Sequence, residues 1–323
     1  MSAWVLATVL LAAPAEDVWE PAKAPPPTPW AMAGARGWRL CQEAERRAVA
    51  YRNGDGPRGG NGSDDQRWQR YARQCPHAVE VLVAAGLTEI LVAADLFREI
   101  GSGDEPESAA GRLAVQRIVE QHRERLETAL GWLDASIAES GRRGQRPPRQ
   151  ARYYRAYALT ALGRIAQARE ALAEVIEAGD VERWRSERMA ALIELFAGDL
   201  DQALRRAHRG VYDAPAEDRI ISRFIRALVL DRAGASVVAR AELRAIQRQS
   251  GADVLRGAME SVLPLHERLF FRALYSQALE LRSPALRFWQ FYLERPEPEQ
   301  PERVLAQRHL DELTPPPVPA GGP

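Results

Sequence analysis

Apolar residues recur along this chain in short blocks that share one order of side chains. Two large apolar residues are followed by an arginine and an alanine at 153–156, 224–227 and 270–273. Each block leads, after a helical turn or so, to a break and then to a second segment rich in small residues. Such recurrence is typical of helical repeat proteins, in which each unit buries its apolar face against the next. Strand-like alternation is almost absent and helix-forming residues dominate, so the pattern predicts an all-α fold.

The breaks carry glycines at a regular spacing. Gly163, Gly198 and Gly234 lie 35 and 36 residues apart. Glycine tolerates the left-handed conformation that commonly ends a helix, so each should close the first helix of a hairpin. Small residues would let the two antiparallel helices approach closely, and alanines stand seven residues before and five residues after each glycine. They are Ala156, Ala191 and Ala227 before, and Ala168, Ala203 and Ala239 after.

This pattern resembles the tetratricopeptide repeat, a helix–turn–helix unit of about 34 residues with glycine at the turn and alanine in the second helix. The best match is Ala197-Gly198-Asp199-Leu200-Asp201-Gln202-Ala203-Leu204, closed by Pro215. Leu162–Ala168 is the next best. A fourth unit over Leu263–Leu293 has Ala273, Ala285 and Trp289 in equivalent places, but it lacks the turn glycine.

The resemblance implies antiparallel helix-hairpin repeats stacked into a TPR-like solenoid over residues 151–293. The chain departs from the family pattern at Arg155, Arg226 and Arg272, where an apolar residue is usual. An irregular helical bundle with coincidental alanine and glycine spacing is the alternative.

The N-terminus predicts export to the periplasm or the exterior. Ala3–Ala13 is an uncharged apolar run that ends in an Ala-x-Ala sequence, so residues 1–15 are expected to be a signal peptide. The run is too short to span a bilayer, and no integral membrane span is expected. No Lys or Arg precedes the run, which leaves a misassigned start codon or an uncleaved anchor as alternatives.

Glycine, proline and charge divide the remainder of the chain. Gly86 is expected to end a helix within the N-terminal helical region. The predicted segments are a Pro-rich linker at 16–36, the N-terminal helical region at 37–141 with a Gly-rich loop at 53–65, an Arg/Pro-rich connector at 142–150, the repeats at 151–293, a capping helix at 294–313 and a disordered tail at 314–323.

Two cysteines, Cys41 and Cys75, flank the Gly-rich loop. In an oxidising compartment an even number of cysteines favours a disulfide, here one that closes a loop of about 35 residues. Two buried free thiols that act as small apolar side chains are the alternative.

Charge composition argues against a nucleic-acid partner. The formal net charge is zero, so no overall basic field attracts a nucleic acid. Lys23 is the only lysine. The densest run of arginines lies between residues 142 and 155 and contains no acid, so Arg142, Arg143 and Arg146 are candidates for binding a polyanion. A solvated connector is the alternative for this run.

In the tetratricopeptide family the first helix of each hairpin lines a concave groove that takes a peptide or a partner helix. The resemblance places seven residues there: Tyr153, Tyr157, Arg188, Leu192, Phe224, Leu228 and Phe270. Phe288, Trp289, Phe291 and Tyr292 form an aromatic cluster that is expected to close the end of the core, with an exposed docking patch as the alternative.

No catalytic, metal or cofactor motif stands out in the sequence. The five histidines lack the i, i+4 spacing of a zinc helix, and no Gly-rich phosphate loop follows a strand. We therefore expect an exported, non-catalytic protein without a cofactor that mediates protein–protein interaction or assembly of an envelope complex. A polyanion-binding envelope protein is the alternative, and an enzyme with an unfamiliar site is a third hypothesis. The sequence leaves the oligomeric state open.

Overall fold

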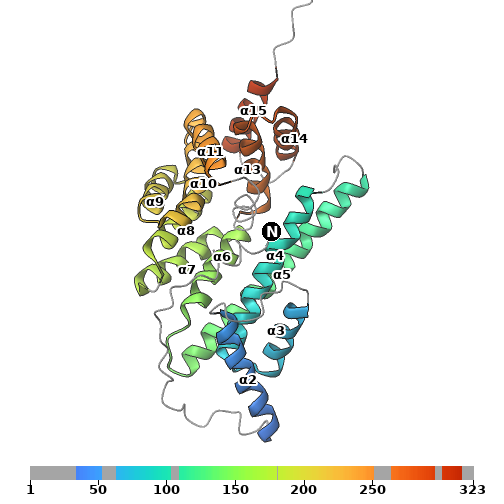
Figure 1. Ribbon diagram of the computed structural model, residues 1–323, viewed down its shortest axis with the longest axis vertical. Helices are drawn as coiled ribbons and strands as arrows, with labels where there is room; N and C mark the ends of the chain where they lie inside the picture. The colour runs from blue at the N-terminus through green and yellow to red at the C-terminus, as the bar shows by residue number, and fades with distance from the viewer. Residues whose placement is uncertain are drawn as a thin grey trace, which may run out of the picture. The chain divides into compact units, whose positions relative to one another are not determined.

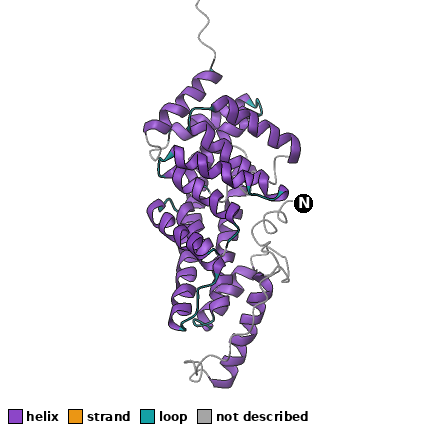
Figure 2. Cartoon of the chain, turned by 90° about the vertical axis from the view of Figure 1, so that its left-hand side faces the viewer, coloured by secondary structure: helices purple, strands orange, loops and turns teal. Residues whose placement is uncertain are grey.

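The computed structural model describes residues 34–52, 63–102, 109–179, 181–250, 263–294 and 300–314. These residues form α-helices joined by short turns, and the described part contains no strand (Figures 1 and 2). The all-α prediction is therefore confirmed. The helices are α2 (Gly34–Arg52), α3 (Ser63–Gln74), α4 (Val79–Ser102), α5 (Ala109–Arg142), α6 (Arg149–Ala161), α7 (Ile165–Ala178), α8 (Arg183–Phe196), α9 (Leu200–Tyr212), α10 (Ala216–Arg232), α11 (Ser236–Ser250), α13 (Leu265–Ala278), α14 (Arg282–Leu293) and α15 (Gln300–Leu313).

The chain divides into two compact units, Met1–Ser186 and Glu187–Pro323. In the first unit, α4 packs along α5, and the hairpin of α6 and α7 follows. In the second unit, successive helices from α9 to α15 pack on their neighbours. The division falls within α8, so α6 and α7 belong to the unit of the N-terminal helices.

Several predicted segments lie outside the described residues. These are the signal peptide at 1–15, most of the Pro-rich linker at 16–36, residues 53–62 of the Gly-rich loop and the tail from 315 onward. The predicted capping helix corresponds to α15. Among the described residues, no helix combines the length and the apolar character needed to cross a membrane.

The prediction that Gly86 ends a helix is wrong, because α4 continues through this residue to Ser102. A Cβ atom at this position would lie 2.8 Å from Cγ of Leu133 and 3.2 Å from the carbonyl oxygen of Ala129, both on α5. The glycine therefore permits the close approach of two long helices, and in a helix interior this function outweighs its poor helix propensity.

A disulfide joins Cys41 of α2 to Cys75, which follows α3, with a Cα–Cα distance of 5.6 Å. It lies inside a buried cluster that includes Ala44, Trp68 and Ala72. The bridge therefore ties α2 and α3 to one core, as predicted from the cysteine count.

Alanine is completely buried at each of the predicted close-contact positions. The eight residues are Ala156, Ala168, Ala191, Ala203, Ala227, Ala239, Ala273 and Ala285. The last two confirm the fourth hairpin, which α13 and α14 form. The structure therefore has the TPR-like helical hairpins that the alanine and glycine spacing predicted.

The turns of these hairpins share one geometry. Gly163, Gly198 and Gly234 have φ of 74°, 80° and 85°. In each turn, the glycine N–H donates to the carbonyl three residues back, and the next N–H donates to the carbonyl five residues before it. This is the Schellman arrangement, which satisfies the free carbonyls of a helix end. Glu280 occupies the same place in the fourth hairpin, with a φ of 60° and the same two hydrogen bonds.

Arginine side chains cap helices other than their own. Four guanidinium groups donate to the carbonyl oxygen of the last residue of a neighbouring helix, where backbone acceptors lack intrahelical partners. The pairs are Arg146 with Ala178 of α7 (2.7 Å), Arg244 with Ala278 of α13 (3.4 Å), Arg282 with Leu313 of α15 (3.1 Å) and Arg303 with Leu293 of α14 (2.6 Å).

The turn geometry predicts opposite effects for two substitutions. A left-handed conformation costs a non-glycine residue about 1–2 kcal/mol, and the greater chain entropy of unfolded glycine offsets about 0.4–1 kcal/mol of that. Glu280→Gly should therefore raise the free energy of unfolding by about 0.5–1 kcal/mol. Gly234→Ala should lower it, although no atom lies within 4 Å of the added Cβ. Urea unfolding measures both, and a loss of stability in Glu280→Gly would contradict the argument.

The disulfide predicts a second stability effect. Replacing both cysteines by serine should lower the free energy of unfolding by about 3 kcal/mol, because a loop of this length gains that much entropy in the unfolded chain. Chemical unfolding of the oxidised wild type and of the double variant measures the difference. Adding a reductant should destabilise the wild type alone, and equal stability of the two proteins would show that the bridge is not formed.

Candidate functional site

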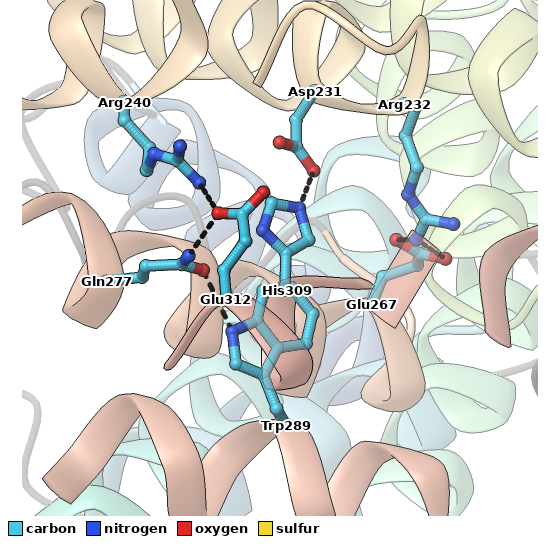
Figure 3. A network of polar contacts seen from close by, with 8 residues as sticks. All are labelled: Asp231, Arg232, Arg240, Glu267, Gln277, Trp289, His309 and Glu312. Atoms are coloured by element: carbon cyan, nitrogen blue, oxygen red, sulfur yellow. Dashed lines mark hydrogen bonds and ion pairs between the residues drawn. The ribbon is translucent and has the colours of Figure 1, made fainter. Parts of the chain in front are cut away.

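The second unit has a buried polar network at the place where α15 docks (Figure 3). Four helices supply the receiving side: α10 provides Asp231 and Arg232, α11 provides Arg240, α13 provides Phe270 and Gln277, and α14 provides Trp289 and Tyr292. We call these seven residues the α15 seat. The facing residues of α15 are Glu302, His309 and Glu312.

The centre of the network is the pair of Asp231 and His309. His309 Nε2 donates to Asp231 Oδ2 at 3.1 Å, and the two side chains are 1% and 0% exposed. The imidazole stacks on the indole of Trp289, with ring centroids 4.7 Å apart and planes at 1°. Asp231 lies in the last turn of α10, where the helix dipole disfavours a negative charge. The hydrogen bond from His309 therefore stabilises the carboxylate of Asp231, which the dipole of α10 does not stabilise.

A chain of hydrogen bonds continues from the indole toward the surface. Trp289 Nε1 donates to Gln277 Oε1 at 3.1 Å, and Gln277 Nε2 donates to Glu312 Oε2 at 3.2 Å. Arg240 donates to the same carboxylate oxygen at 2.8 Å. Glu312 is therefore held by residues of two helices, α11 and α13, and one of them, Gln277, is itself fixed by Trp289 of α14.

Arg232 forms the second charged centre of the seat. Its guanidinium lies over the Phe270 ring at 3.7 Å from the centroid, and Nη2 donates to both oxygens of Glu267, at 2.8 and 2.6 Å. Nη1 forms an ion pair with Glu302 at 2.9 Å. Burial alone would lower the pKa of Arg232, but the two carboxylates outweigh burial and raise it. The guanidinium is therefore a permanent cation that faces the start of α15.

Tyr292 completes this side of the seat. Its hydroxyl lies 3.5 Å from Glu302 Oε2. Burial raises the pKa of Tyr292, and the charges of Glu267 and Glu302 raise it further, against the opposing effect of Arg232. The phenol therefore remains a hydrogen-bond donor toward the carboxylate. Within the described part of the chain, no cluster of His, Cys, Asp and Glu is arranged to hold a metal ion.

The predicted groove residues are mostly buried. Six of the seven are at most 8% exposed: Tyr153, Tyr157, Leu192, Phe224, Leu228 and Phe270. Phe224 contacts Phe271 and Tyr275 edge-on or tilted, at 5.7 and 6.0 Å between ring centroids. These side chains are core residues, and the prediction that they line an open groove is wrong for them. Arg188, on α8, is only partly exposed.

The predicted polyanion candidates are partly engaged within the protein. Glu139 forms ion pairs with Arg142 at 2.6 Å and Arg143 at 3.0 Å. Arg143 also donates to the carbonyl of His77, and Arg146 caps α7. The sequence run contained no acid, but the acid that pairs with Arg142 and Arg143 lies three residues before the run, in α5. Arg142 keeps a largely exposed side chain, at 62%, and Arg146 is exposed as well.

Four of the seat residues were not predicted as members of a site: Asp231, Arg232, Arg240 and Gln277. His309 and Asp231 are 78 residues apart in the chain, so no local spacing connects them. The aromatic cluster was a partial signal: Trp289 and Tyr292 are completely buried and close the core as expected. An Asp-Arg pair directly before the turn of α10 could have drawn attention, because an acid at a helix C-terminus needs compensation.

The environment of Glu139 predicts a pH effect. Burial raises the pKa of this carboxyl, but hydrogen bonds from Arg143 and His77 and the charges of both arginines outweigh burial and lower it below the ordinary 4.5. A lowered pKa in the folded state stabilises the fold above the ordinary value, and the contribution is lost as the pH falls through the folded pKa. Glu139→Gln should therefore lose about 1–2 kcal/mol at pH 7 and less below pH 4. Thermal unfolding of the wild type and the variant at pH 7 and below pH 4 measures the two losses of stability. The same substitution at the exposed Glu170 is the control. Equal losses for Glu139→Gln at both pH values would contradict the prediction.

No family model matches the chain, and no curated protein matches it. Among solved structures, the chain is similar to YrrB, described as a TPR protein with an unusual peptide-binding site. The two are 17% identical, the matched region covers 67% of this chain and 97% of YrrB, and the TM-score is 0.32. The TPR-like character of the hairpins therefore rests on the geometry of their turns and on their buried alanines.

Proposed function

We propose that this protein is a non-catalytic binding protein that recognises a helical segment of a protein partner through its helical hairpins. The observation that carries the proposal is the docking of α15. Side chains of α10, α11, α13 and α14 together hold one amphipathic helix through charge pairs, hydrogen bonds and aromatic contacts. A surface that holds a helix in this way is suited to recognising a partner helix with matching side chains.

The buried acids support a binding function over catalysis. Five carboxylates are buried in the described part: Glu89, Glu139, Glu187, Asp231 and Glu267. Each is paired with an arginine or a histidine of the same chain. Groups that are neutralised in this way stabilise and orient helices. A catalytic acid or base would instead need to reach a substrate.

We propose further that the protein is exported and acts in an envelope complex. The apolar run Ala3–Ala13 supports export, and the disulfide between Cys41 and Cys75 is of the kind that persists in oxidising compartments. The zero net charge favours a protein partner over a nucleic acid. Polyanion binding is not proposed, because Arg143 and Arg146 already donate to backbone carbonyls.

Affinity capture by the mature chain tests the proposal. The chain from Glu16 onward, immobilised and exposed to an envelope extract at about 50 mM and about 500 mM salt, should retain one protein at both concentrations, because a desolvated interface is screened little by salt. Retention must then be reproduced with the purified partner. Material kept only at low salt, and consisting of lipid or polysaccharide, would contradict the proposal and favour the polyanion hypothesis.

A further inference from the structure

Helix α15 buries few apolar groups for its length. Among its residues with described side chains, Leu305, Ala306 and His309 are buried. Leu310 and Leu313 are half-buried, so the completely buried apolar contact is small. The other attachments are polar, and those at the surface, such as Arg282 to the carbonyl of Leu313, contribute little each. The helix is therefore held by a small apolar contact and many oriented polar ones.

The surface under α15 is rich in aromatic groups. Phe270, Trp289 and Tyr292 are completely buried, and the Phe270 ring lies edge-on to the other two at 4.9 and 5.4 Å. Each such side chain covers about 150–250 Å². Without α15 the seat would be an apolar patch bordered by one acid, Asp231, and two cations, Arg232 and Arg240. A patch of that kind requires an occupant.

The charge pairs determine which occupant fits. Glu302, Leu305, Ala306, His309 and Glu312 lie on one helical face, at i, i+3, i+4, i+7 and i+10. A buried ion pair contributes little net stability compared with apolar packing, but a charge left without its partner is costly. The seat therefore discriminates most at the position of His309, whose partner Asp231 is completely buried, and less at those of Glu302 and Glu312, whose side chains are 27% and 41% exposed. It discriminates little between two helices that both have these groups.

We propose that the α15 seat binds a helix of a partner protein, and that α15 competes with this helix for the seat. The partner helix has the side-chain pattern of α15, with carboxylates at the positions of Glu302 and Glu312 and a histidine at the position of His309. This inference rests on the proposed function and names the surface and the chemistry of its partner. The seat is available to that partner when α15 is displaced. Binding of the partner and release of α15 are therefore one equilibrium.

A peptide exchange experiment on the full chain tests this. The probe is a fluorescently labelled peptide of residues 300–314, titrated with wild type, His309→Ala and Asp231→Asn. The alanine variant weakens only the internal competitor, so it should bind the peptide roughly tenfold more tightly than wild type, a change of about 1.4 kcal/mol. The asparagine variant weakens the seat for both helices, so it should bind no more tightly than wild type.

Two further variants control the experiment. Glu312→Gln, at a partly exposed position, should increase peptide affinity in the same direction by a smaller factor, and it keeps the test valid where His309→Ala does not fold. His208→Ala makes the same substitution at an exposed position of α9 and should leave the affinity unchanged. A peptide with alanine in place of its histidine should lose roughly tenfold in affinity for the His309→Ala protein.

Three outcomes would overturn the inference. Equal peptide affinity of wild type, His309→Ala and Glu312→Gln would mean that α15 does not compete. An equal gain in His309→Ala and Asp231→Asn would mean that exposed apolar surface binds without regard to charge. A dimer of the variants by light scattering, with no peptide binding, would make a second copy the occupant. Any of these outcomes, found together with a protein partner retained in the capture experiment, would remove this inference and leave the proposed function in place.

Discussion

Each of the four TPR-like hairpins has one completely buried alanine in its first helix and another in its second, twelve residues later. Because alanine has the smallest side chain that still favours a helix, the backbones at these points can approach more closely than larger residues would allow. The turn between the two alanines must then be short and must satisfy the helix-end carbonyls, which the Schellman geometry does. The spacing, the turns and the pairing of helices all depend on this close contact.

Close packing of backbones also determines where charge can be placed. Large apolar side chains from successive helices fill the layers between hairpins, as the contacts of Phe224 with Phe271 and Tyr275 show. Charged groups that enter these layers are found in pairs, such as Asp231 with His309 and Arg232 with Glu267. Such pairs contribute orientation more than stability, because the loss of hydration offsets most of their attraction. Specific docking of α15 is the consequence of this arrangement.

The regular parts of the fold could be predicted from the sequence because they depend on local spacing. Glycine turns and alanine contacts recur at fixed distances, and each position has one physical requirement. Gly86 was misjudged because the same residue type serves as a helix end or as a contact with another helix, and only the position of Leu133 decides between them. Glu280 gave no signal, since a glutamate with positive φ is not expected from its residue type.

The site was harder to predict because it depends on which surface is covered. Six of the seven first-helix residues that the family resemblance assigned to a groove are buried by neighbouring helices, and nothing in a single helix indicates that. The seat brings together α10, α11, α13, α14 and α15, and the partners are as many as 78 residues apart. Residue types identify its members as unusual, such as a buried histidine. They do not identify the partners.

The capping of α14 and α15 is reciprocal. Arg282 of α14 holds the last carbonyl of α15, and Arg303 of α15 holds the last carbonyl of α14. Helices usually begin to fray at their ends, and an array of repeats can open one unit at a time from its terminus. Here neither C-terminal turn can fray without releasing a bond that also holds the other helix. Each of these hydrogen bonds therefore couples the last turn of one helix to the first turn of the other, so that fraying at either C-terminus loosens both α14 and α15.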